Sequence, residues 1–265
     1  MTTERAVDNC TCAPKGLRNL ATKHVGATGR SPPPSSREKE FMTFHTPEIK
    51  ICGLTRVDEA VACAEAGADA IGLVFYPPSP RHLTTQQARE ISLALPDQTA
   101  RVGVFVNCPV SDIQKRIDDC RLTSVQLHGQ EPPNMVRELC NGGVRVIKAL
   151  FIHRPPLISE ASHYPEAAFL VECGKGQLPG GNAMTWNWGE VKLFGQSYPL
   201  ILAGGLSPDT IARAVFEAGP DAVDISSGVE FSPGRKDIHK VSTLIRAISL
   251  CTLERQPRRI WHSTG

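Results

Sequence analysis

A single cysteine closes the first short apolar segment of this chain, in the run Lys50-Ile51-Cys52-Gly53-Leu54. In parallel α/β folds the carboxyl ends of the strands carry the chemistry, so a reactive side chain at such an end is a candidate for catalysis. A free cysteine is also among the most buried residue types and often packs as a small apolar side chain. On position alone, Cys52 is therefore either a catalytic thiol or a packing residue.

Two carboxylates and an imidazole end other short apolar segments, at Glu172, Asp224 and His128. An unpaired buried glutamate is costly, so we expect Glu172 to be solvated, paired or functional. His128 can titrate near neutral pH, but we favour a supporting hydrogen-bonding role for it. Asp224 is predicted to hold substrate hydroxyl groups, the alternative being an aspartate that caps a helix or bonds a loop.

Arg81 follows a proline-rich loop that begins at Tyr76. A guanidinium on a stiff loop suits a substrate carboxylate, because its planar donors match the two oxygens. The alternative interpretation is a solvated surface arginine. We predict the first role.

Two turns rich in glycine and serine follow the last two apolar segments, at residues 203–208 and 224–230. Adjacent glycines let backbone N–H groups approach an anion, and we expect a helix with Pro208 at or near its first turn. Barrels commonly hold phosphate at this place. The predicted phosphate-binding residues are Gly204, Gly205, Ser226, Ser227 and Gly228. Together with the thiol, the carboxylates and the arginine, they indicate acid–base chemistry on a phosphorylated sugar.

Short β-branched segments alternate with amphipathic ones from Glu48 onward, a pattern typical of βα units on a parallel sheet. Eight strands are predicted, at residues 48–52, 70–75, 101–106, 123–127, 144–149, 168–172, 199–203 and 221–225. The helical patterns include residues 57–66, 84–95 and 208–217. An open doubly wound sheet commonly has five or six strands and a glycine fingerprint after the first, which this chain lacks. We therefore predict a single (β/α)8 TIM barrel, of the α/β class, over residues 47–250.

Composition restricts the class of partner. The 265 residues are 41% hydrophobic and carry a net charge of +2, with 29 basic and 27 acidic residues mixed along the chain. Such a balance gives no basic field for nucleic acid or a membrane surface, so we expect a small-molecule phosphosugar substrate. The 9 scattered cysteines fit reduced thiols in the cytoplasm, and Cys10 and Cys12 alone do not make a metal site.

Both ends of the chain differ from the barrel pattern. Residues 1–46 have no hydrophobic periodicity and contain a proline and serine run and a charged run, so we predict a disordered extension. One hypothesis places the start of translation at Met42, just before the first strand. Residues 251–265 form a basic tail, which from Glu254 onward is expected to be frayed and solvated.

Taken together, these motifs resemble the phosphoribosylanthranilate isomerase family of tryptophan biosynthesis over about residues 48–248. The segments that carry the resemblance are 50–54, 75–81, 126–129, 203–206 and 224–230, with Pro233-Gly234. The resemblance implies a monomeric or homodimeric (β/α)8 enzyme that performs an Amadori rearrangement without metal or organic cofactor.

The same resemblance implies a role for each site residue. Cys52 would be the general base that removes the C2 proton, as a thiolate whose pKa is lowered locally. Glu172 would be the general acid that opens the furanose ring. Arg81 would meet the anthranilate carboxylate, Asp224 the sugar hydroxyls, and Gly205 and Ser227 the phosphate.

The chain departs from the family pattern where Glu172 replaces the usual aspartate and where residues 180–183 read Gly-Gly-Asn-Ala. Two alternatives follow: a phosphate-binding barrel with weak or lost catalysis, and another phosphosugar isomerase or epimerase of the same fold. Trp186 and Trp188, after this loop, are expected to pack rather than to stack on substrate.

Overall fold

The computed structural model describes residues 45–175 and 185–261. The predicted disordered extension, except for residues 45–46, and the loop at residues 180–183 lie outside these ranges, as does Met42. None of the helices in the described ranges is both long and apolar enough to cross a membrane.

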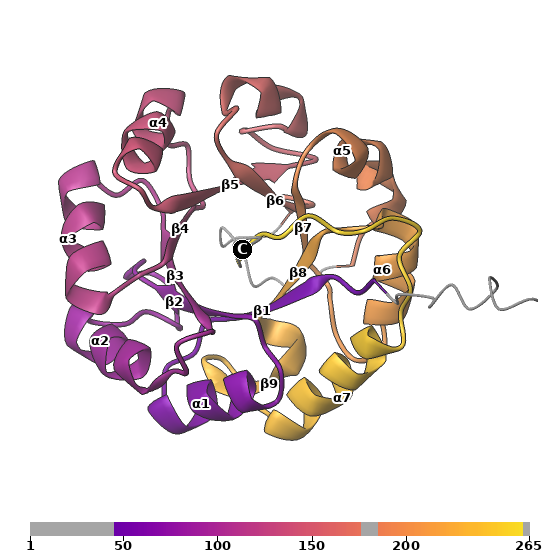
Figure 1. Ribbon diagram of the computed structural model, residues 1–265, viewed down its shortest axis with the longest axis horizontal. Coiled ribbons are helices and arrows are strands. Elements are labelled where there is room, and N and C mark those ends of the chain that lie inside the picture. The colour runs from indigo at the N-terminus through magenta and orange to yellow at the C-terminus, as the bar shows by residue number, and fades with distance from the viewer. Residues whose placement is uncertain (1–44, 176–184, 262–265) are drawn as a thin grey trace, which may run out of the picture. The chain divides into compact units, whose positions relative to one another are not determined.

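Eight parallel strands close into a barrel in chain order, as predicted, with the helices outside it (Figure 1). The strands are β1 (Glu48–Cys52), β2 (Ala70–Val74), β3 (Ala100–Phe105), β4 (Ser124–Leu127), β5 (Arg145–Phe151), β6 (Ala168–Glu172), β7 (Leu200–Ala203) and β8 (Ala222–Ile225). Each predicted strand agrees with its observed counterpart to within two residues at either end. Closure of β1 on β8 brings the first and last strands side by side.

The α-helices of the barrel are α1 (Val57–Glu65), α2 (Thr85–Ala94), α3 (Val110–Cys120), α4 (Pro133–Asn141), α5 (Lys192–Ser197), α6 (Ile211–Ala218) and α7 (Ile238–Ser249). Short 3-10 helices are η1 (Ile158–His163), η2 (Trp188–Val191) and η3 (Ser227–Val229), and a small hairpin consists of β9 (Glu230–Ser232) and β10 (Arg235–Lys236). The helix expected near Pro208 begins later, at Ile211. The reason is local: Thr210 Oγ1 accepts from Ser207 N at 2.9 Å and donates to Gly205 O at 2.9 Å, which holds the preceding residues in a turn.

Alternation along the strands separates the helix-facing core from the interior of the barrel. Ile49 and Ile51 of β1 belong to the large apolar cluster that includes residues of the surrounding helices. Cys52 belongs instead to a small cluster with Val74 and Val104, at the carboxyl ends of β1, β2 and β3. Lys50 is two residues before Cys52, so both side chains lie on the inner face.

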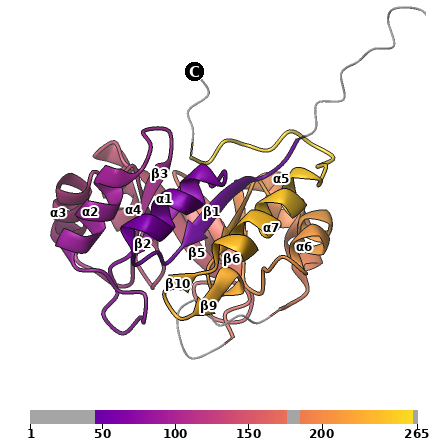
Figure 2. The ribbon, with the colours of Figure 1, turned by 90° about the horizontal axis from the view of Figure 1, so that it is seen from below.

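The chain after α7 corrects one prediction: up to Trp261 it is not frayed but held against the barrel, although side chains such as Glu254 and Arg259 remain exposed. Residues 251–261, which we call the C-terminal strap, cross the end of the barrel where β1 begins (Figure 2). Asp221 is fully buried and accepts hydrogen bonds from Arg255 Nη1 at 2.6 Å and from Arg258 N at 2.7 Å. The basic residues of the strap therefore pair with carboxylates of the barrel.

A second carboxylate fixes the end of the strap. Glu48 Oε2 accepts from the backbone N–H groups of Ile260 at 2.6 Å and Trp261 at 3.0 Å. The side chains of Ile260 and Trp261 are buried in one apolar cluster with Ala70, Ala222 and other apolar residues of the barrel strands. The strap thus closes the amino-terminal end of the barrel, opposite the ends of the strands that carry Cys52 and Glu172.

Candidate active site

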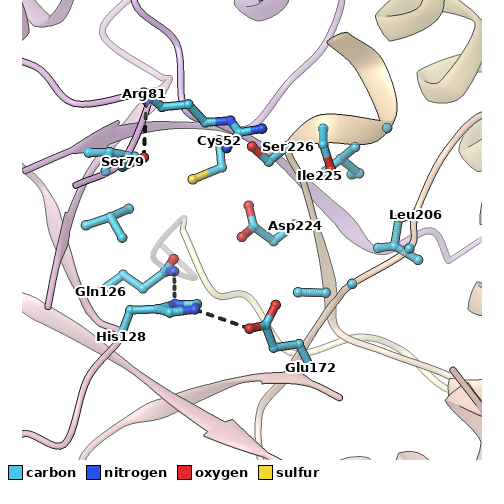
Figure 3. A pocket seen from close by; sticks show the side chains of 17 residues that line it. Cys52, Ser79, Arg81, Gln126, His128, Glu172, Leu206, Asp224, Ile225 and Ser226 are labelled. Carbon is cyan, nitrogen blue, oxygen red and sulfur yellow. Dashed lines mark hydrogen bonds and ion pairs between the residues drawn. The ribbon is translucent and has the colours of Figure 1, made fainter. Parts of the chain in front are cut away.

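A single cavity at the carboxyl ends of the strands is lined by every site residue predicted from the sequence (Figure 3). These residues are Cys52, Arg81, His128, Glu172, Gly204, Gly205, Asp224, Ser226, Ser227 and Gly228. They come from the ends of β1, β4, β6, β7 and β8 and from the loop after β2. The closed parallel barrel explains this, because it brings the carboxyl ends of all its strands to one mouth.

Cys52 occupies a space that its neighbours keep open. It lies opposite Gly72 of β2 in the register, and a Cβ atom on Gly72 would stand 2.6 Å from the Cys52 sulfur. Lys50 lies opposite Asp224 of β8 and donates to its Oδ1 from Nζ at 2.8 Å. The thiol therefore has a buried ion pair beside it.

The electrostatic environment of Cys52 contradicts the expectation that its pKa is lowered. Burial raises the pKa of the Cys52 thiol above its ordinary value, the Lys50 ammonium opposes this, and Asp224 adds to it. Burial alone would lower the pKa of Lys50, but Asp224 and Cys52 together outweigh burial, and that pKa is raised. In the free site, Lys50 is thus an ammonium and Cys52 a protonated thiol at neutral pH.

Glu172 lies next to His128 in the lining of the cavity. Their Oε1 and Nε2 atoms are 3.5 Å apart, and both side chains are buried. Gln126 Nε2 lies 2.9 Å from His128 Nδ1, within hydrogen-bond distance, whereas His128 Nε2 makes no hydrogen bond within the described residues. His128 thus contacts Gln126 through one ring nitrogen and lies beside the Glu172 carboxylate through the other, and its supporting role stays a prediction.

Two tryptophans hold the turn after β7 beside Glu172. Trp186 Nε1 donates to Ala203 O at 3.0 Å, and Trp188 Nε1 donates to Gly204 O at 3.1 Å. Trp188 is fully buried. Both side chains are packing residues, as predicted.

The two glycine-rich turns contact each other. Gly204 and Gly205 have φ angles of 86° and 70°, which favour glycine. A Cβ atom on Gly228 would stand 1.8 Å from the carbonyl oxygen of Leu206, so the turn after β8 packs directly on the turn after β7. Backbone groups of both turns therefore line one side of the cavity, as a single phosphate site requires.

Arg81 is buried and paired, which excludes the alternative of a solvated arginine. Its Nε and Nη2 atoms donate to the two carboxylate oxygens of Glu230 at 2.8 and 2.7 Å. Its side chain packs on Gly53, where a Cβ atom would stand 2.3 Å from Arg81 Cδ. The guanidinium extends over the cavity between Cys52 and Ser226 (Figure 3).

The structure adds polar residues that sequence reasoning did not place in the site. Ser79 and Gln126 line the cavity, whereas Lys50, Glu230 and Lys236 contact residues that line it. For Lys50 a signal existed, because a lysine two residues before Cys52 in a strand must share its face. The same spacing relates Gln126 to His128. Glu230 and Lys236 lie in the hairpin after β8, and no periodic pattern indicated that their charges turn inward.

Comparison with known proteins gives a consistent result. Residues 49–247 match the family model described as N-(5'phosphoribosyl)anthranilate (PRA) isomerase. An N-(5'-phosphoribosyl)anthranilate isomerase from Desulfatibacillum aliphaticivorans is 46% identical over 214 residues, which cover 81% of this chain and 98% of that protein.

Solved structures agree with these relatives. The phosphoribosyl anthranilate isomerase from Thermotoga maritima is 36% identical with a TM-score of 0.71, covering 76% of this chain and 98% of that one. A second such structure, in complex with reduced 1-(o-carboxyphenylamino)-1-deoxyribulose 5-phosphate, is 35% identical with a TM-score of 0.69 and the same coverage.

Proposed function

Because this chain belongs to the N-(5'-phosphoribosyl)anthranilate isomerase family, we propose that Cys52 and Glu172 carry the proton transfers of its reaction. The enzyme isomerises N-(5'-phosphoribosyl)anthranilate to 1-(2-carboxyphenylamino)-1-deoxyribulose 5-phosphate in tryptophan biosynthesis. The observation that supports the assignment is geometric. A thiol on β1 and a carboxylic acid on β6 face one cavity from opposite sides (Figure 3).

Glu172 acts first in this scheme, as the general acid. It gives a proton to the furanose oxygen, the C1–O bond breaks, and the anthranilate nitrogen and C1 form an iminium. His128 Nε2 lies 3.5 Å from Oε1 of Glu172, and we assign the transferred proton to the second carboxylate oxygen. The imidazole therefore orients the acid rather than replacing it.

Cys52 then acts as the general base. The thiolate, formed when the thiol loses its proton to water, removes the proton from C2, and the iminium takes up the electron pair to give an enolamine. Protonation of C1 and loss of the C2 hydroxyl proton to water then give the ketone. The thiolate must form in a buried place that raises its pKa, and the neighbouring ammonium of Lys50 reduces that cost.

The two ends of the substrate are anionic, and each is assigned to its own group of residues lining the cavity. We assign the phosphate to the turns that contain Gly204, Gly205, Ser226, Ser227 and Gly228. We assign the anthranilate carboxylate to Arg81, and the ribose hydroxyls to Asp224. For the assembly we propose a monomer or homodimer, as the resemblance implies.

The alternative of a phosphate-binding barrel with weak or lost catalysis receives no support from the comparisons, which name isomerases. A glutamate provides the same acid chemistry as an aspartate, one methylene further from the backbone.

Anthranilate fluorescence tests the proposal directly. The purified protein should consume N-(5'-phosphoribosyl)anthranilate generated in the cuvette, and Cys52→Ala and Glu172→Gln should each reduce kcat by at least about 100-fold. Both variants should still bind the reduced product analogue. Substantial turnover by Cys52→Ala would reject the thiolate as the base.

A further inference from the structure

A buried carboxylate on the small hairpin, Glu230, contacts residues that belong to both anion-binding ends of the cavity. Glu230 begins β9, and its side chain is 5% exposed. It receives two parallel hydrogen bonds from Arg81, through Nε to Oε1 and Nη2 to Oε2. Such a bidentate pair fixes the plane of the guanidinium as well as its position.

This pairing leaves one edge of Arg81 for a ligand. Nε and one N–H group of Nη2 donate to Glu230. No residue in the described part of the chain accepts a hydrogen bond from Nη1. Arg81 lines the cavity, and its end-on edge, formed by the two terminal nitrogens, is the geometry in which an arginine binds a second carboxylate.

Glu230 also contacts the phosphate side of the cavity through Lys236. Lys236 Nζ donates to Glu230 Oε1 at 2.8 Å and to the carbonyl oxygen of Ser226 at 3.1 Å. The Lys236 side chain is fully buried. One carboxylate thus fixes both the arginine and the lysine that holds the start of the turn after β8.

The charges explain why this carboxylate is needed. Burial would raise the pKa of Glu230, but Arg81 and Lys236 outweigh burial and lower it, so the group stays ionised. Without that negative charge, two buried cations would face each other, and Arg81 would no longer have a partner to hold its plane.

We propose that Glu230 is a positioning residue that gives the enzyme its selectivity for a substrate with an aryl carboxylate. It holds Arg81 with the end-on edge toward the cavity. Through Lys236, it also fixes the distance between the guanidinium and the turn after β8. The inference rests on the proposed function, because it takes Arg81 as the group that binds the anthranilate carboxylate.

Two stable ligands test this selectivity. Reductive amination of ribose 5-phosphate with anthranilate or with aniline gives secondary amines that differ only in the carboxylate. Isothermal titration of the wild-type protein should show that the carboxylate improves Kd by about tenfold or more, as for a hydrogen-bonded charge pair. In Glu230→Gln the ratio of the two Kd values should fall below about threefold.

A matched control separates positioning from a general effect on the hairpin. Glu59 is also buried and accepts from Arg235 Nε at 2.6 Å and from Lys236 N at 2.9 Å, but it makes no hydrogen bond to Arg81. Glu59→Gln should weaken both ligands alike and keep the ratio. Glu230→Asp, which keeps the charge, should give a ratio between those of the wild type and Glu230→Gln, and it serves as the test variant if Glu230→Gln does not fold.

The outcomes are distinct. A ratio that stays at tenfold or more in Glu230→Gln, or in Glu230→Asp where only that variant folds, overturns the inference and leaves the role of Arg81 intact. An equal collapse in Glu59→Gln also overturns it, since selectivity would then depend only on an intact hairpin. A ratio near one in the wild-type protein refutes the proposed role of Arg81 itself, and the inference with it.

Discussion

Replacing Trp261 by alanine should destabilise the barrel without slowing its reaction. The side chain is 4% exposed and lies in the apolar cluster at the closed end of the barrel. Truncating a buried aromatic side chain costs about 3 to 5 kcal/mol. The indole Nε1, however, has no hydrogen-bond partner among the described residues, and removing this buried donor returns about 1 kcal/mol.

The net loss expected for Trp261→Ala is therefore about 2 to 4 kcal/mol, which lowers Tm by about 4 to 16 °C in a domain of this size. Thermal unfolding followed by circular dichroism measures Tm, because the helical signal is lost as the barrel unfolds. The value of kcat/KM should stay within about twofold of wild type, because Trp261 is at the end of the barrel opposite Cys52.

Trp261→Phe provides the matched control. It keeps an aromatic side chain and removes the unpaired N–H, so stability should stay within about 1 kcal/mol of wild type. A Tm for Trp261→Ala equal to that of wild type would show that the strap is not part of the folded core, and the reasoning would fail.

Three further predictions concern the mouth and the wall of the barrel. Gly228→Ala should weaken binding of inorganic phosphate, measured by calorimetry, by at least about tenfold, because the new methyl group overlaps the carbonyl of Leu206; unchanged affinity would refute the packing of the two turns. Lys148→Met should cost about 3 to 5 kcal/mol in urea unfolding, because it leaves the buried Glu131 carboxylate without its partner at 3.0 Å, and adding Glu131→Gln should restore part of the loss. Alkylation of Cys52 by iodoacetamide, followed by mass spectrometry, should rise about tenfold per pH unit from pH 7 to beyond the ordinary thiol pKa of about 8.5, because a raised pKa keeps the thiolate scarce; a plateau near pH 7 would contradict the raised value.

The sequence was sufficient for the barrel and for the residues around its mouth, because both depend on local patterns. A strand end is visible in a run such as 168–172, and the closed barrel then brings every such end together. The pKa of Cys52 was not predictable in this way. Its direction depends on burial and on Asp224, which is 172 residues away in the sequence.

The C-terminal strap shows the limit of composition as a guide. Arginines in a polar tail predict solvated chain, and nothing local shows that Asp221 is fully buried and accepts their hydrogen bonds. Likewise, the partner of Arg81 is 149 residues away, on a hairpin of only five strand residues. Pairings of this kind are set by the closed fold and appear only when it is known.

The hydrogen bond from Leu253 N to His45 O, at 2.9 Å, has a consequence for engineering the chain. It places the beginning of the described barrel beside the strap, at the closed end. β1 then runs for five residues, or about 13 Å, before it reaches Cys52. A short linker between these two ends would cross the closed face and leave the mouth free. A circular permutant with new termini on an outer helical turn should therefore keep the whole active site, and a domain attached at residue 45 should leave the approach of substrate open.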